Sequence, residues 1–224
     1  MSPRVRHLLL GDWGPIVRDG IDVLRLSYLV AAVVLVAAGR FDGGIRMFIT
    51  FLALVVARQL DLPRPFDLGL VLGMALQAWG NAVGLFTSIS WWDSLVHLVL
   101  PFWVAPLFYI LLVRLELVPD LCDETHERHH QGIVIVTFAL GLAFGAVYEI
   151  YEWFAVNVLG AHLYVGYTDT IKDLTEDAAA SIAGGILLLL WATRGWATTR
   201  RVPERALARG RSRLRSSTRS VRYR

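Results

Sequence analysis

Ionisable side chains at helical spacing occur in three polar motifs, "WWDSLVH", "YEIYEW" and "DTIKDLTED", of an otherwise apolar chain. Residues three or four positions apart share one face of a helix, so each motif would present its ionisable groups together. The candidate metal ligands are Asp93, His97, Glu149, Glu152, Asp169, Asp173 and Asp177. If the three helices face one another, these side chains would line a single cavity.

Crowded carboxylates favour a bound cation or shared protons, because like charges resist ionising side by side. Oxygen ligands with a single imidazole suit Mg²⁺, Mn²⁺ or Ca²⁺ better than Zn²⁺ or copper. Two amides, Gln77 and Asn81, stand four residues apart on an apolar segment. We expect them to form hydrogen bonds that orient the carboxylates without binding the metal themselves. Ordinary hydrogen bonding between helices is the alternative.

The elements that would position these groups are membrane-spanning helices. Apolar residues make up 55% of the 224 residues, against about 45–50% in soluble domains. A span needs roughly 20 apolar residues, and lipid requires its backbone to be hydrogen-bonded within the helix. The sequence predicts an all-α bundle with about six spans, near 23–39, 45–60, 67–87, 95–116, 132–157 and 177–194. Five spans with a re-entrant second segment is the alternative.

Basic residues are distributed unevenly between the two sides of a six-span bundle. Of 22 basic residues, 11 are arginines between 194 and 224, and most others fall on the same side as that tail. The opposite side holds only Arg40, Arg46 and Lys172. Positively charged loops stay in the cytoplasm, so both termini are predicted to be cytoplasmic in a multi-pass protein of the cell (inner) membrane. The three polar motifs then share the outer side.

The chain is expected to form one transmembrane domain over residues 1–195, followed by a disordered arginine-rich tail over residues 196–224. The tail would lie along anionic lipid, and no nucleic acid is expected as a partner. A single cysteine, Cys122, excludes an internal disulfide. The N-terminus lacks the pattern of a cleaved signal peptide.

Four segments in order resemble the YjdF-type inner-membrane proteins, a family of unknown function: "FDLGLVLGMALQAWGNAVGLF", "WWDSLVHLVLPF", "YEIYEW" and "GYTDTIKDLTEDAAASIAGG". The resemblance covers about residues 45–195 and implies a polytopic helical membrane protein. The family pattern of Asp-x-x-x-His, paired Glu and spaced Asp falls on the seven candidate ligands. A remoter similarity, to VanZ-like proteins, would imply cell-envelope chemistry.

Three kinds of function remain open from the sequence. The outer acidic site could hold a divalent cation or a cationic headgroup in a binding or structural protein. It could instead serve a metal-dependent enzyme that acts on a lipid or lipid-linked envelope substrate, with His97 or a carboxylate as base. The third possibility is a proton- or cation-coupled transporter. No nucleophile is identifiable, and the HExxH, P-loop and GxSxG motifs are absent from the sequence.

Overall fold

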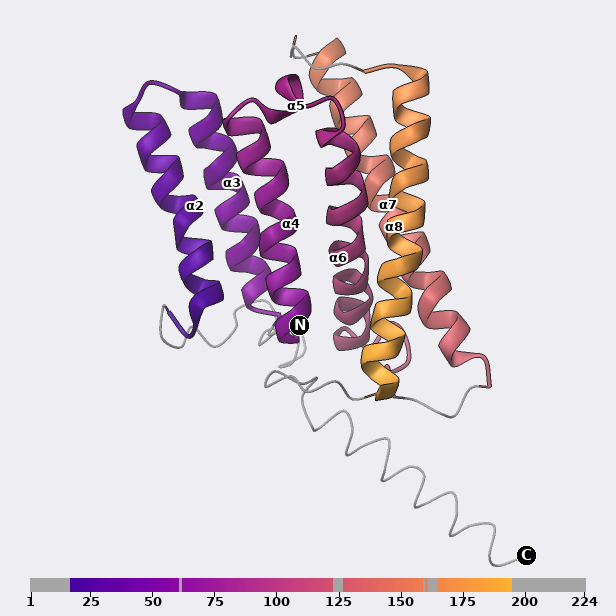
Figure 1. The fold of residues 1–224 in the computed structure, drawn as a ribbon. Coiled ribbons are helices and arrows are strands. Elements are labelled where there is room, and N and C mark those ends of the chain that lie inside the picture. Colours follow the sequence, from indigo (N-terminus) through magenta and orange to yellow (C-terminus); the bar gives the residue numbers. More distant parts are fainter. Residues whose placement is uncertain (1–16, 61, 123–126, 159, 161–164, 195–224) are drawn as a thin grey trace, which may run out of the picture.

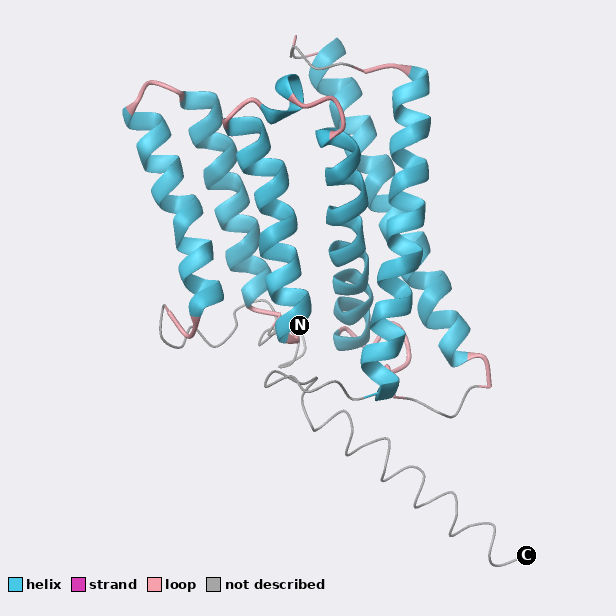
Figure 2. Ribbon diagram, viewed as in Figure 1, coloured by secondary structure: helices cyan, strands magenta, loops and turns pink. Residues whose placement is uncertain are grey.

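The computed structural model describes residues 17–60, 62–122, 127–158, 160 and 165–194. Within these ranges the protein is all-helical, with six helices of 18 or more residues, one short helix and no strand (Figures 1 and 2). The all-α prediction is therefore confirmed for the described chain. The predicted tail over 196–224 lies outside the described residues.

The first three long helices are α2 (Gly20–Ala37), α3 (Phe41–Arg58) and α4 (Arg64–Ala82). Asp19 caps α2, because its carboxylate accepts the backbone N–H groups of Ile21 and Asp22. Gly39 and Gly84 follow α2 and α4 with φ angles of 77° and 78°. A glycine tolerates this left-handed backbone without a Cβ clash, so the chain can turn sharply there.

The remaining helices are α5 (Leu85–Ser88), α6 (Trp92–Arg114), α7 (His129–Asn157) and α8 (Tyr167–Arg194). The long helices alternate in direction, so the start of α6, the end of α7 and the start of α8 lie at one end of the molecule (Figure 1). The start of α2, the end of α3 and the start of α4 lie at the opposite end.

The bundle consists of two groups of three helices. Helices α2, α3 and α4 pack on one another, and so do α6, α7 and α8 (Figure 1). The two groups meet mainly where α4 packs against α6. Each group therefore places residues from three helices around its own interior.

Small residues allow α6, α7 and α8 to approach closely. Gly141 packs against Ser181 and Ala105, and Gly145 packs against the side chain of Asp177. A Cβ at either glycine would overlap these neighbours. Close backbone approach through glycine is typical of helix pairs in membranes. It brings the acidic face of α8 directly against α7.

Four of the described helices, α2, α6, α7 and α8, are long and apolar enough to cross a membrane. Helices α3 and α4 form as predicted but fall outside this set. Charged or amide side chains interrupt their apolar sequence: Asp42, Arg46 and Arg58 in α3, and Arg64, Asp67, Gln77 and Asn81 in α4.

Two predicted boundaries were wrong. The segment predicted as a span over 67–87 ends at Ala82, because Gly84 turns the chain into the separate helix α5. The last helix begins at Tyr167 rather than at residue 177. The motif "DTIKDLTED" therefore lies inside α8, and the helical spacing of its acids, on which their shared face depends, is confirmed.

Candidate cation site

His97, in the second turn of α6, is the centre of the polar contacts among α6, α7 and α8. Its Nδ1 lies 2.9 Å from Oδ1 of Asp177, to which it donates a hydrogen bond. This bond leaves Nε2 on the opposite side of the ring, where Oδ1 of Asp93 is 3.8 Å away and Oε1 of Glu149 is 4.0 Å away. One imidazole thus contacts acids from three helices.

Asp173 completes the group around His97. Asp93, His97 and Asp173 each offer one ligand atom, and these atoms lie within 4.8 Å of one another. The Oε1 atom of Glu149 is buried and has no hydrogen-bond partner among the described residues. We call Asp93, His97, Glu149 and Asp173 the cation site, since their oxygen and nitrogen atoms lie close enough together to be candidate metal ligands.

The cation site is buried on one side and open on the other. The side chains of His97, Glu149 and Asp173 are 5%, 6% and 2% exposed, whereas that of Asp93 is 35% exposed. Access from outside the bundle therefore runs past Asp93. This position is the start of α6, at the end of the molecule where α5 also lies (Figure 1).

The other predicted ligands surround the site without entering it. Asp169 is half-buried in the first turn of α8. Glu152 is half-buried near the end of α7. Asp177 occupies the far side of the His97 ring, where it fixes the imidazole rather than facing the group around Nε2.

One of the two predicted supporting amides reaches the site. Nε2 of Gln77 donates a hydrogen bond of 2.5 Å to the Tyr148 hydroxyl. The Tyr148 ring in turn lies against His97, with ring centroids 5.9 Å apart. Asn81, one turn further along α4, makes no hydrogen bond to the site among the described residues. Sequence reasoning did not single out Tyr148, whose role depends on contacts between α4, α6 and α7.

Negative charge exceeds positive charge around the cation site. Three acids in the interior, Glu149, Asp173 and Asp177, lie near one imidazole. The nearby Lys172 is 47% exposed, and its Nζ lies 3.4 Å from Asp173 and 3.6 Å from Glu176. An exposed ammonium compensates a buried carboxylate weakly, because water screens it.

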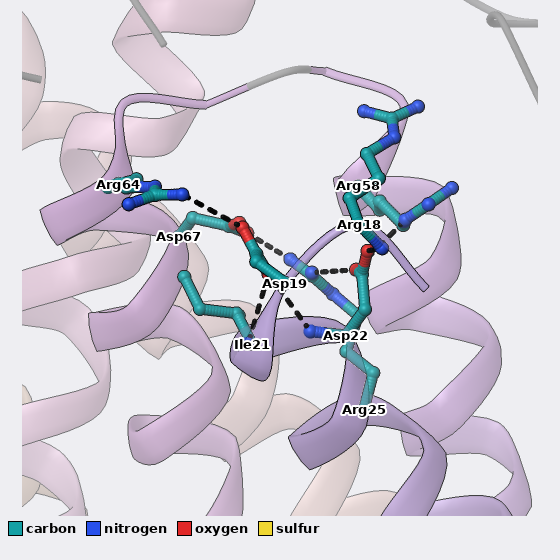
Figure 3. Close-up of polar contacts among 8 residues, drawn as sticks. All are labelled: Arg18, Asp19, Ile21, Asp22, Arg25, Arg58, Arg64 and Asp67. Carbon is teal, nitrogen blue, oxygen red and sulfur yellow. Dashed lines mark hydrogen bonds and ion pairs between the residues drawn. The ribbon is translucent and has the colours of Figure 1, made fainter. Parts of the chain in front are cut away.

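A second buried group of charges, which was not predicted from the sequence, lies in the other half of the molecule. Arg25 bridges the carboxylates of Asp22 and Asp67, and Nε of Arg58 lies 2.9 Å from Asp22 (Figure 3). We call Asp22, Arg25, Arg58 and Asp67 the arginine cluster. Its signal in the sequence is the Asp22–Arg25 spacing of three residues inside an apolar helix, which places both on one face.

The rim of the arginine cluster adds further contacts. The backbone N–H of Arg18 donates to Oδ2 of Asp22 over 2.9 Å, and Arg64 lies 3.7 Å from Asp19 (Figure 3). Together with the Arg58–Asp22 pair, these contacts tie the start of α2 to the end of α3 and the start of α4. The cluster is thus a charged core in which arginine and aspartate are present in equal number.

No curated protein and no solved structure matches the chain. A family of predicted membrane proteins does match, and the YjdF-type resemblance is consistent with that family. The similarity to VanZ-like proteins is not shown. Because residues 23–196 match the family described as "Predicted membrane protein (DUF2238)", the chain belongs to this family.

Proposed function

We propose that the protein is a six-span protein of the cell (inner) membrane that binds a divalent cation on its extracytoplasmic side. The observation that carries the proposal is the orientation of His97. Its Nδ1 is bonded to Asp177, and its Nε2 faces Asp93 and Glu149 with Asp173 nearby. A metal-bound histidine commonly has this arrangement, in which a carboxylate fixes the ring and its tautomer.

The cations that suit the site are Mg²⁺, Mn²⁺ and Ca²⁺. Three carboxylates and one imidazole would provide the ligands, and carboxylate oxygens favour these ions. Asp177 would not be a ligand in this arrangement. It would hold His97, while Gln77 and Tyr148 would support the ring from the α4 side. Asp169 and Glu152 would attract the cation to the rim.

The arginines support an extracytoplasmic position for the cation site. Arg18, Arg58, Arg64, Arg114 and Arg194 stand at helix ends opposite the cation site. Loops rich in arginine favour the cytoplasm, so the cation site would lie on the outer side. Exposed aromatic residues near the site, among them Trp91, Tyr151 and Trp153, suit the level of the lipid headgroups.

An enzyme acting on a lipid or lipid-linked substrate is the second candidate. The observation that favours it is the exposure of Asp93, which leaves one side of the site open at headgroup level. A bound cation could there polarise a phosphoryl oxygen of the substrate. Cation binding is common to both candidates, so its measurement comes first.

The test is the metal content and thermal stability of the full-length protein purified in detergent. Wild type is compared with Asp173→Asn and Glu149→Gln, before and after addition of Mg²⁺, Mn²⁺ or Ca²⁺. We expect one metal ion per chain in wild type and a raised melting temperature that both variants lose, because binding to the folded state stabilises it.

Asp42→Asn is the matched control, since Asp42 is an acid near the same end of the bundle whose side chain is 77% exposed. It should bind metal as wild type does. Absence of metal from wild type, or equal metal in the Asp173 and Glu149 variants, would reject the proposed site.

A further inference from the structure

Lys172 places a positive charge of the chain itself beside the cation site. It lies in the second turn of α8, next in sequence to Asp173. Its Nζ donates a hydrogen bond of 3.4 Å to Oδ1 of Asp173, whose side chain is 2% exposed. Because Asp173 also belongs to the group with Asp93 and His97, the ammonium contacts one of the candidate metal ligands.

A second acid lies within reach of the same ammonium. Oε1 of Glu176, four residues further along α8, is 3.6 Å from Nζ of Lys172. Oε2 of Glu176 is buried and has no hydrogen-bond partner among the described residues. Glu176 is not one of the four residues of the cation site. Lys172 therefore stands between a candidate metal ligand and an acid that has no part in binding the metal.

The side chain of Lys172 can move between these two acids. It is 47% exposed, and a lysine ammonium stands on a flexible stem with four carbons. Ion pairs of an exposed ammonium are weak, because water screens them. Exchange of Asp173 for Glu176 would also replace one ion pair by another, so the movement would cost little.

We propose that Lys172 is an internal competitor of the divalent cation and withdraws from Asp173 to Glu176 when the ion binds. Its role rests on the cation binding proposed above, which supplies the ion that it competes with. Two positive charges beside one carboxylate repel each other, so the ammonium would lower the affinity of the site for a metal ion. Glu176 would offset part of this cost by receiving the displaced ammonium.

Such a competitor would make cation binding reversible. In the metal-free protein, the ammonium would partly compensate the charge of Asp173. In the metal-bound protein, the ion would compensate it instead. The lysine would therefore reduce the difference in net charge at Asp173 between the two states, and the ion would be released more readily than from a site of acids alone.

The test measures Mn²⁺ affinity of the full-length protein in uncharged detergent at constant ionic strength, from the electron paramagnetic resonance signal of unbound Mn²⁺. Lys172→Met should bind Mn²⁺ about two- to fivefold more tightly than wild type, since the exposed ion pair that it removes is weak. Lys172→Arg keeps the positive charge and should bind as wild type does. If Lys172→Met fails to fold, Lys172→Gln removes the same charge and is measured instead.

Arg46→Met is the matched control for loss of a positive charge. Arg46 is a partly exposed cation near the same end of the bundle, and its Nε lies 2.9 Å from Asp42 rather than beside the cation site. Its replacement should leave the Mn²⁺ affinity unchanged.

A further variant separates displacement of the ammonium from a simple change of charge. Glu176→Gln should weaken Mn²⁺ binding about twofold in wild type, because the ammonium loses its alternative partner. In the Lys172→Met background the same change should have little effect, since no ammonium remains to be received. If Glu176 only attracted the cation through space, its loss would weaken binding equally in both backgrounds, and the displacement would be disproved.

The competitor and the cation site can fail separately. If neither wild type nor Lys172→Met binds Mn²⁺, both are rejected. If wild type binds Mn²⁺ and Lys172→Met binds it equally or more weakly, the cation site stands and the competitor alone is rejected. Weaker binding together with a lower melting temperature in EDTA would assign Lys172 a structural role instead.

Discussion

The arginine cluster and the cation site are two solutions to the same problem, the burial of carboxylates between three helices. Each group takes its residues from three helices: the start of the first (α2 or α6), the later part of the second (α3 or α7) and the early part of the third (α4 or α8). Asp22 and Arg25 on α2 correspond in this sense to Asp93 and His97 on α6. The two groups lie at opposite ends of the bundle.

The difference between them is the source of positive charge. In the arginine cluster, Arg25 and Arg58 lie within the chain's own fold and bond directly to Asp22. In the cation site, the corresponding positions hold His97 and Glu149, so acids exceed bases. A buried carboxylate needs a partner charge or a proton. The comparison therefore contrasts a charged core that is balanced within the fold with a group whose acids outnumber its bases, and this excess of acid supports the cation binding proposed above.

Removing an internal cation should have the largest effect. Arg25→Gln is expected to lower the free energy of unfolding by about 3–5 kcal/mol, since breaking a buried ion pair leaves its partners poorly compensated. Thermal unfolding in detergent, with size-exclusion chromatography to check folding, measures the loss. The double variant Arg25→Gln/Asp67→Asn should recover part of it, because one buried negative charge is removed as well. If the single variant were as stable as wild type, the stability of the protein would not depend on the positive charge of Arg25.

The packing around Asp177 should give the next largest effect. Gly145→Ala places a methyl group where the Asp177 carboxylate lies, and overpacking of this kind costs about 1–3 kcal/mol. Metal binding should fall with it, because Asp177 positions His97. The control is Gly132→Ala on the same helix, where a Cβ meets no atom within 4 Å. That change should stabilise α7 by about 0.5–1 kcal/mol. Equal effects of the two substitutions would contradict the close fit at Gly145.

Helical periodicity made the site's helices and shared faces predictable from the sequence. The spacing of Asp93 and His97, and of Asp173 and Asp177, correctly indicated groups on common faces. The separate roles of Asp173 and Asp177 could not be predicted. They depend on where α6 and α7 meet α8, which places Asp177 against Nδ1 of His97 and groups Asp173 with Asp93 and His97.

The arginine cluster escaped prediction for a different reason. An arginine near the end of an apolar segment usually extends its charge to the interface, and it then carries information about orientation only. Arg25 instead lies 2% exposed between Asp22 and Asp67. Asp22 and Asp67 are 45 positions apart, and nothing in local spacing pairs them. Only the packing of α2 against α4 brings them together.

The finest test of the comparison applies the same substitution, Asp→Asn, to both groups in the presence of EDTA. Asp67→Asn should lower stability by about 1.5–3 kcal/mol, since it weakens a hydrogen bond to a charged arginine. Asp173→Asn should raise stability slightly, by about 0.2–0.5 kcal/mol for each like-charge pair at four-residue spacing that it removes. Asp169 and Asp177 form such pairs with Asp173 along α8. Thermal unfolding of both variants beside wild type shows whether each substitution raises or lowers the stability.

Whether Asp173→Asn raises or lowers the stability decides whether the acids of the cation site have too little positive charge around them. Lys172 is the alternative source of compensation, because its Nζ lies 3.4 Å from Asp173. Lys172→Met therefore accompanies the test, and its effect should be small, since an exposed ion pair contributes about 0–1 kcal/mol. If Asp173→Asn instead destabilised the metal-free protein as Asp67→Asn does, His97 and Lys172 would already balance the site. The excess of acid that calls for a cation from outside would then not exist.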